Sequence, residues 1–454
     1  MLQKLRARSK LTKPTLNLPP RPRKLPFIGN LHNLSRFDPP HHTFTELAKK
    51  HGPLMHLQLG EVDTIIVSSP EIAKHILKTH DITTDKICTL ELLSTKRVQS
   101  FLPIREQEVL DLCKWIARHE GSPINVAEKV SLRNYDIMVR AALGKKTNEQ
   151  ATFVAIVKEA VEFIVISGLK RKIEELHVKS DRIIGNIIED RKRVNAAKID
   201  EGKKQEEDLL DVLLKIQEAG SLELPFTMDN IKSVLGFSSL SLIHFDGIET
   251  STTVVDWAMA EMVKNPRVLT KAQNEVRDLF DSKQHRVDES CLDELTYLKL
   301  VIKETLRMHP PAPLLLPRET RENCEINGYN IPAKTRVLVN VWAIGRSPKY
   351  WENPERLEPE RFLHKSVDYK GNMFEYIPFG AGRRICPGIS FGLANVEMPL
   401  AMFLYHFDWI LHHGMKPEEM EMKESCGVAA RRESSLYVIP VPVVRQPLPV
   451  SFEG

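Results

Sequence analysis

Cys386 lies in the segment from Pro378 to Gly388, which reads Pro-Phe-Gly-Ala-Gly-Arg-Arg-Ile-Cys-Pro-Gly. Proline directly after the cysteine is favoured in the first turn of a helix, because its φ angle is already set for helical backbone. We therefore predict that a helix begins at Pro387. The unpaired N–H groups and the positive end of that helix would face the sulfur and favour its thiolate form. A thiolate held in this way is a candidate metal ligand.

The glycines around this cysteine favour a large, flat cofactor. Gly380, Gly382 and Gly388 carry no side chain, so the backbone there can pass close to a bound group. Backbone N–H groups aimed at a metal-bound sulfur also tune its electron donation. Arg384 is placed to meet an anionic group such as a propionate. The residues alone leave a second interpretation open, a glycine-rich turn that holds a buried and inert thiol.

A second candidate for chemistry is the segment Asp246-Gly-Ile-Glu-Thr-Ser, in a stretch with helical periodicity. Gly247 weakens the helix, and the hydroxyl of Thr250 can bond to a carbonyl one turn earlier. An acid beside a hydroxyl, here Glu249 with Thr250, can relay protons. The alternative is a polar, solvated helix turn, but apolar residues on both sides favour burial.

The elements that must position these residues are mostly helices. Alternation predicts a strand pair over residues 52–67, and short apolar runs predict strands near 314–316 and 336–341. The charged residues 198–208 are expected to form a solvated loop. Helical periodicity predicts helices over residues 70–79, 104–118, 147–166, 169–197, 227–264, 266–280, 296–308 and 387–405. Without repeats or a break in composition, we predict one mainly α domain with a small, strand-rich lobe.

The composition excludes several classes of protein. The 454 residues are 42% hydrophobic and 27% charged, as in an ordinary globular protein. With 64 basic and 60 acidic residues, the net charge of +4 is too small to indicate nucleic acid as a partner. None of the six cysteines forms a CxxC pair, so a zinc motif or dense disulfide framework is not indicated. No apolar run of 18 residues exists that would span a bilayer as a helix.

The cysteine segment resembles the haem-binding signature of the cytochrome P450 family. Phe379, Gly382, Arg384, Cys386 and Gly388 fit Phe-x-x-Gly-x-Arg-x-Cys-x-Gly. The resemblance runs from about Leu18 to about Ile439. It implies the mainly α cytochrome P450 fold and haem b (iron protoporphyrin IX) as the cofactor, with Cys386 as the axial iron ligand. It also implies that Phe379, Gly380, Gly388 and Gly247 lie beside the cofactor.

Further motifs follow in the order that the family requires. Glu304 and Arg307 form Glu-x-x-Arg, and with Arg361 they resemble the family's structural triad. Glu249 and Thr250 resemble its oxygen-activation motif, although Asp246 stands where a small residue is usual. Arg318 is expected to hold a second propionate. Four apolar residues are expected in the substrate pocket: Ala312, Leu314, Leu315 and Leu316.

The segments Phe391-Gly-Leu-Ala-Asn395 and Tyr405-His-Phe-Asp-Trp409 are similar to those of plant microsomal members, closest to a group rich in terpenoid hydroxylases. We expect residues 1–17 to be a basic linker after a missing N-terminal membrane anchor and residues 18–26 a proline-rich hinge. Residues 27–445 would form the monooxygenase domain and residues 446–454 a tail. A frayed, soluble N-terminus is the alternative for the first stretch. The resemblance implies a place on the cytoplasmic face of the endoplasmic reticulum membrane.

Two stretches depart from the family pattern, near residues 81–86 and 163–168, where the family carries substrate loops and a helix with Trp-x-x-x-Arg. We expect mobile loops missing from the printed residues there. If the polypeptide itself lacks these loops, the resemblance no longer implies that the protein retains haem or is active.

The predicted reaction inserts one atom of O2 into a lipophilic small molecule, such as a plant terpenoid. The chain shows no GxGxxG site, so electrons would come from NADPH through NADPH–cytochrome P450 reductase. One alternative is a haem-thiolate enzyme that isomerises or dehydrates its substrate without O2. The Glu249–Thr250 pair argues against it, because such enzymes tend to lack this acid–threonine pair. Another is a non-catalytic haem- or lipid-binding protein, which the two shortened stretches keep open.

Overall fold

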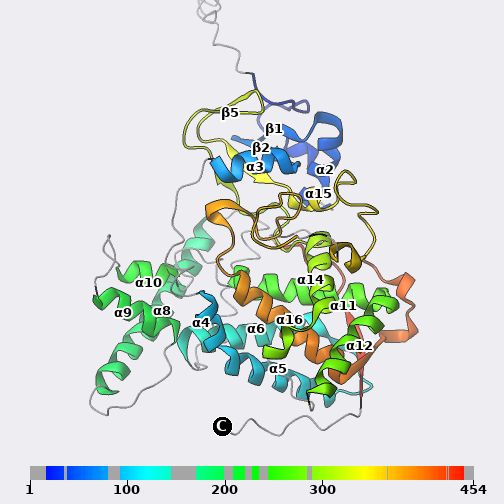
Figure 1. The fold of residues 1–454 in the computed structure, drawn as a ribbon. Helices are drawn as coiled ribbons and strands as arrows, with labels where there is room; N and C mark the ends of the chain where they lie inside the picture. The colour runs from blue at the N-terminus through cyan, green and yellow to red at the C-terminus, as the bar shows by residue number, and fades with distance from the viewer. Residues whose placement is uncertain are drawn as a thin grey trace, which may run out of the picture.

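Helices build most of the molecule, and the short strands β1, β2 and β5 gather in a lobe at one end together with α2 and α3 (Figure 1). The structure, a computed structural model, describes residues 17–34, 38–79, 93–144, 170–198, 208–219, 227–234, 244–283, 289–363, 365, 367–425, 427 and 429–443. The predicted fold class, mainly α with a small β lobe, is confirmed.

The helices and strands have the following bounds. The α-helices are α2 (Pro40–His51), α3 (Pro70–Thr79), α4 (Thr95–Ser100), α5 (Leu102–Ala117), α6 (Val126–Leu143), α8 (Lys170–Lys198), α9 (Leu209–Ala219), α10 (Met228–Val234), α11 (Thr250–Lys264), α12 (Pro266–Ser282), α13 (Glu289–Leu292), α14 (Thr296–Met308), α15 (Val341–Gly345) and α16 (Ile389–His406). A π-helical turn, η3 (His244–Glu249), precedes α11. Short 3-10 turns are η1 (Leu31–Asn33), η4 (Pro359–Phe362), η5 (Gly382–Arg384), η6 (His412–Gly414) and η7 (Pro417–Glu419). The strands are β1 (Leu54–Leu59), β2 (Val62–Val67), β3 (Ile124–Asn125), β4 (Arg318–Glu319), β5 (Cys324–Ile326), β6 (Tyr329–Ile331), β7 (Arg336–Val339), β8 (Phe407–Leu411) and β9 (Tyr437–Pro442).

The sheets join parts of the chain that lie far apart in sequence. The largest has the order β1-β2-β7-β4, in which β1 and β2 form the predicted hairpin around Gly60, whose φ is 66°. Strand β7 pairs parallel with β2, so Thr64 lies beside Arg336. The second sheet, β3-β9-β8, pairs Ile124 with Val438 near the end of the described chain.

Helix α11 forms the centre of the helical part, in contact with α6, α14 and α16 (Figure 1). Every residue from Ser251 to Val263 is buried. A helix buried on all sides must satisfy its polar groups inside the protein. The hydroxyl of Thr252, for example, accepts a hydrogen bond of 3.1 Å from the amide of Asn134 on α6. Asn265 and Pro266 end the helix as predicted.

Three predicted elements need correction. The helix over residues 227–264 is not one α-helix, because α10 ends at Val234 and the π-helical turn η3 stands before α11, while residues 235–243 lie outside the described part. The run 314–316 is not a strand. Leu315 has a φ of 51°, and its N–H donates to the carbonyl of Ala312. Prolines 310, 311, 313 and 317 surround this turn, and proline cannot donate to a β ladder.

The third correction concerns the last long helix, which begins at Ile389 and not at Pro387. Gly388 caps it with φ −90° and ψ 17°, and its carbonyl accepts the N–H of Gly392 at 2.8 Å. The predicted helix over 147–166 lies outside the described residues. Among the described residues, no helix is both long and apolar enough to cross a membrane.

An ion cluster between α5 and α6 gives a test of the fold. Glu108, buried on α5, accepts hydrogen bonds from Arg133 and Arg140 of α6 at 3.1 and 2.8 Å. We expect Glu108→Ala to lower the free energy of unfolding by about 2–4 kcal/mol, because it leaves two partly buried guanidinium groups without this carboxylate. Denaturant titration followed by circular dichroism measures the change. Glu46→Ala, which removes an exposed pair with Lys49, is the control and should cost less than about 1 kcal/mol. Equal losses in the two variants would contradict the prediction.

Candidate functional site

The loop that carries Cys386 is closed by its own backbone. The N–H of Cys386 donates to the carbonyl of Phe379 at 2.9 Å, and the N–H of Gly380 donates to Ile377 at 2.9 Å. Gly380 and Gly382 have φ angles of 75° and 76°, which only glycine adopts without strain. The chain therefore folds back between Phe379 and Cys386 and presents the sulfur just before helix α16.

The surroundings of this sulfur fit a flat cofactor with a soft metal. No disulfide joins the described cysteines, and Cys386 is half-buried. A Cβ placed on Gly388 would lie 3.8 Å from the sulfur, so this glycine lies directly beside the thiol. A Cβ on Gly380 would lie 3.8 Å from the side chain of Leu315, which brings the turn after α14 next to the cysteine loop. A thiolate donor in a glycine-lined cradle is suited to haem iron.

Helix α11 and the π-helical turn before it carry the predicted acid and hydroxyl. Thr250 is half-buried at the first position of α11, and Glu249, the last residue of η3, is buried. Single π-helical turns widen a helix locally and occur often at functional sites. A Cβ on Gly247 would lie 2.2 Å from the terminal methyl of Met138, so a larger residue there would displace the end of that side chain on α6. Contact between Gly247 and a cofactor stays a prediction.

The carboxylate of Glu249 forms an ion pair that the sequence did not predict. Nη2 of Arg431 lies 2.5 Å from Oε2 of Glu249, and the Glu249 side chain is only 8% exposed whereas that of Arg431 is 50% exposed. Arg431 belongs to the irregular segment after β8, more than 180 residues away in the chain. The predicted proton-relay acid is thus joined, through Arg431, to a part of the surface.

Further contacts tie the same C-terminal segment to α11. The indole N–H of Trp257 donates to the carbonyl of Ala430 at 2.7 Å, and His309 stacks on Trp257 with ring centres 3.7 Å apart. His309 also bonds to Glu261 at 2.9 Å. Asp256 is buried on the same helix, where burial raises the pKa of its carboxyl to about 6 although Arg432 lowers it. Residues 430–432 therefore lie along α11 and the π-helical turn that carries Glu249.

The three residues of the predicted triad lie in direct contact. Both oxygens of Glu304 accept from Arg307 at 2.8 and 2.9 Å, and Oε1 also accepts from Arg361 at 2.8 Å. Glu304 and Arg307 are 0% and 1% exposed. Arg307 also donates to the carbonyl of Gly345, and a Cβ on Gly345 would lie 2.6 Å from the Arg307 carbonyl. The triad thus fastens α14 to α15 and to η4.

The remaining predicted residues lie at different depths. Phe379 is half-buried and meets the ring of Tyr369 edge-on at 5.4 Å. Arg384 is exposed in η5, and Arg318 is half-buried on β4. Of the expected pocket residues, Ala312 and Leu315 are half-buried and Leu316 is 55% exposed. Leu314 packs instead against the cluster of Phe44, Met55, Leu57, Ile66 and Leu338 in the small lobe. Whether these side chains meet substrate stays a prediction.

Comparison with known proteins agrees with this geometry. The family model described as Cytochrome P450 matches residues 19–86 and 83–438. The chain is 49% identical to salviol synthase of Salvia pomifera over 481 residues, covering 96% of this chain and 93% of that protein. It is 48% identical to desmethyl-deoxy-podophyllotoxin synthase of Sinopodophyllum hexandrum, covering 94% and 92%. Premnaspirodiene oxygenase of Hyoscyamus muticus is 46% identical, with 94% and 93% covered.

A solved structure has the same fold. A zebra fish cytochrome P450, in a structure with abiraterone, aligns with a TM-score of 0.74 at 22% identity. The alignment covers 89% of this chain and 99% of that one. At this identity the likeness concerns the fold alone.

The comparisons also bear on the shortened stretches. The two matched pieces of the family model meet at residues 83–86, where one shortening was predicted. The printed sequence is continuous through both positions, and the alignment with desmethyl-deoxy-podophyllotoxin synthase spans 474 positions, more than the 454 residues of this chain. The break in the family match at residues 83–86 agrees with a shortening there, whereas the shortening near residues 163–168 stays a prediction. Residues 80–92 and 145–169 lie outside the described part.

The Glu249–Arg431 pair can be tested by its effect on stability. We expect Arg431→Ala to lower the free energy of unfolding by about 1–2 kcal/mol, because it removes a cation from a buried carboxylate. In the background of Glu249→Gln the same substitution should cost clearly less, which a double-mutant cycle measures. Arg356→Ala is the control, since that guanidinium lies 3.9 Å from Glu358 and is 75% exposed. A coupling energy near zero would show that the pair contributes nothing.

Proposed function

The chain belongs to the cytochrome P450 family, and on that premise we propose that it is a haem-thiolate monooxygenase acting on a lipophilic small molecule. One atom of O2 enters the substrate and the other leaves as water. The observation that carries the proposal is the thiol of Cys386, presented by a glycine-lined loop just before α16. The family implies a haem cofactor, and we propose that it is haem b.

Cys386 would hold the iron, and Arg384 and Arg318 would hold the two propionates. The thiolate donates electron density to the iron, and bound haem supplies the chemistry of O–O cleavage. The hydrogen bond from the N–H of Cys386 to Phe379 fixes the loop and thereby the direction of the sulfur. Gly388 lies beside the sulfur without a side chain of its own.

Glu249 and Thr250 are proposed to deliver protons. Thr250 is half-buried at the start of α11, where its hydroxyl can pass a proton toward the haem side. Glu249 is buried behind it and ion-paired with Arg431, which is half-exposed. This pair gives the acid a connection to solvent and fixes its carboxylate at the end of the π-helical turn.

Electrons are proposed to come from NADPH through NADPH–cytochrome P450 reductase. The adjacent Arg383 and Arg384 are both exposed in η5, on the loop that carries Cys386. Two exposed guanidinium groups favour docking of an acidic partner. Such a partner would then dock on the same loop that carries the sulfur of Cys386.

The substrate is proposed to be a plant specialised metabolite such as a terpenoid. Relatives with 46–49% identity carry the names salviol synthase and premnaspirodiene oxygenase. Half-buried Ala312 and Leu315 lie on the turn that approaches the cysteine loop, which supports an apolar site.

We further propose that the protein works at the cytoplasmic face of the endoplasmic reticulum membrane, where an N-terminal anchor would hold it. Apolar side chains near the start of the described chain support contact with a lipid surface. Phe27 is 98% exposed, and Leu25, Ile28 and Leu31 are 42–43% exposed. Neighbouring exposed apolar side chains are suited to contact with a lipid surface.

The ligand assignment is tested by Cys386→Ala. We expect the purified variant to contain almost no haem, because the axial bond to iron is lost. The reduced wild-type protein mixed with carbon monoxide should show the strongly red-shifted Soret band of a thiolate ligand. Cys324→Ala is the control, since Cys324 is also half-buried but lies on β5. Normal haem content in Cys386→Ala, or an ordinary Soret band in the wild type, would refute the assignment. Turnover without O2 and NADPH would indicate an isomerase instead.

The proton-delivery role is tested by Thr250→Val, which keeps the shape of the side chain and removes the hydroxyl. We expect product formed per NADPH consumed to fall at least about 10-fold, with the excess appearing as hydrogen peroxide, because protons no longer arrive in step with electrons. Thr252→Val is the matched control, since that hydroxyl faces Asn134 on α6. Unchanged coupling in Thr250→Val, or equal losses in both variants, would argue against the role.

A further inference from the structure

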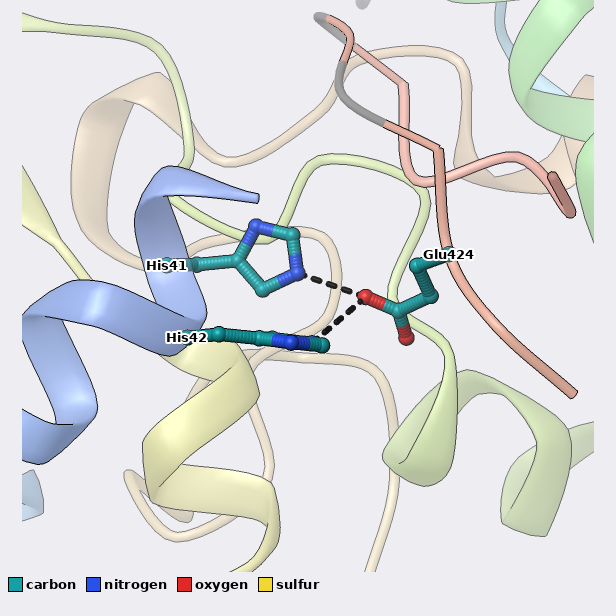
Figure 2. Close-up of side chains that lie close together, drawn as sticks. All are labelled: His41, His42 and Glu424. Carbon is teal, nitrogen blue, oxygen red and sulfur yellow. Dashed lines mark hydrogen bonds and ion pairs between the residues drawn. The ribbon is translucent and has the colours of Figure 1, made fainter. Parts of the chain in front are cut away.

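Two histidines and a glutamate converge at the boundary between the small lobe and the helical part. His41 and His42 lie in the first turn of α2, and Glu424 lies in the C-terminal segment, 382 residues after His42 (Figure 2). Nε2 of His41 is 2.6 Å and Nε2 of His42 is 3.1 Å from the same oxygen, Oε2 of Glu424. The three ligand atoms all lie within 4.8 Å of one another.

The start of α2 explains why both rings reach the same point. Pro39 and Pro40 precede the histidines, and proline at the first helical position fixes the backbone there. The hydroxyl of Thr45 donates to the carbonyl of His41 at 2.7 Å, and the amide of Asn340 donates to the same carbonyl at 2.9 Å. The two rings stand edge to face with centres 4.6 Å apart.

An outer layer of hydrogen bonds orients the glutamate. Its other oxygen, Oε1, accepts from the indole of Trp342 at 3.1 Å and from His309 at 3.4 Å. His309 in turn bonds to Glu261, 2.9 Å away. Partners of this kind fix ligand direction in metal sites. Oε2 is therefore the oxygen directed at the two histidines.

The local charges and access also suit a dication. Arg346, stacked 4.0 Å over the ring of Trp342, opposes a cation, but its guanidinium is paired with Glu355 at 3.3 Å. The carboxylates of Glu424 and Glu261 are both buried nearby. The side chain of His42 is 34% exposed, so an ion and a water ligand can enter from that side.

We propose that His41, His42 and Glu424 form a binding site for Zn²⁺, with water as the fourth ligand. Two imidazoles, a carboxylate and water are a common ligand set for zinc with an open position. Bonds of about 2.1 Å in a tetrahedron place ligand atoms roughly 3.4 Å apart, so the side chains need to move by less than about 1 Å. The ion would link helix α2 to the C-terminal segment and stabilise the folded chain by mass action.

The test uses the intact, haem-loaded protein after treatment with a chelator. Equilibrium dialysis against Zn²⁺, followed by elemental analysis, should find one zinc per chain in the wild type. His42→Ala, a change at a half-exposed side chain, should weaken binding at least about 10- to 100-fold. Added Zn²⁺ should raise the melting temperature of the wild type by a few degrees and leave that of His42→Ala unchanged.

The control is His413→Ala, which removes one histidine from another adjacent pair, His412 and His413, outside the cluster. It should bind zinc like the wild type. Glu424→Gln gives a second test, because glutamine keeps the size of the side chain and removes the charge. Zinc bound equally by wild type and His42→Ala, or by neither, overturns the proposal and leaves the cluster as a hydrogen-bonded one. These readouts do not depend on turnover, so they stand apart from the proposed reaction.

Discussion

The geometry of the site depends on one buried carboxylate, that of Glu304, held between two guanidinium groups. Arg307 binds it from the same helix and Arg361 from η4, and all of these bonds are 2.8–2.9 Å long. Because a buried charge without its partner is costly, the arrangement in which all three meet is strongly favoured. Tyr376 lies in the chain between η4 and the cysteine loop. Its hydroxyl donates a hydrogen bond to the carbonyl of Lys303 on α14. The position of Cys386 relative to α14 follows from this network.

Much of the fold and the contacts within the triad could be predicted from the sequence. Helix 296–308 matches α14 to the residue, and the cysteine, the acid–hydroxyl pair and the triad were all named from short motifs. Motifs of this kind work because a few residue types at fixed spacing determine local geometry. The π-helical turn at 244–249 and the turn at Leu315 were missed, because packing against neighbouring helices and prolines overrides simple periodicity. Arg431 and Glu424 lie in irregular chain without periodicity, so only the tertiary structure brings them to their partners.

Helix α11 connects the predicted site with the C-terminal segment. It is buried from Ser251 to Val263, yet the buried acids Glu249, directly before it, and Asp256 and Glu261, on it, need polar partners inside the protein. In the C-terminal segment, Arg431 pairs with Glu249 and Arg432 lies near Asp256. His309, just after α14, binds Glu261. The polar side chains of the central helix thus require a specific course for the segment 424–432. The same segment reaches α2 through Glu424.

The pairing of His41 with Glu424, of β2 with β7 and of β3 with β9 has a consequence for synthesis on the ribosome. The N-terminal lobe is made first, but its partners emerge only hundreds of residues later. At roughly 5–20 residues per second, the nascent chain waits for some 20–80 seconds with apolar strand edges uncovered. Such a chain cannot complete these pairings while its N-terminal part emerges, and the uncovered strand edges favour aggregation during that time.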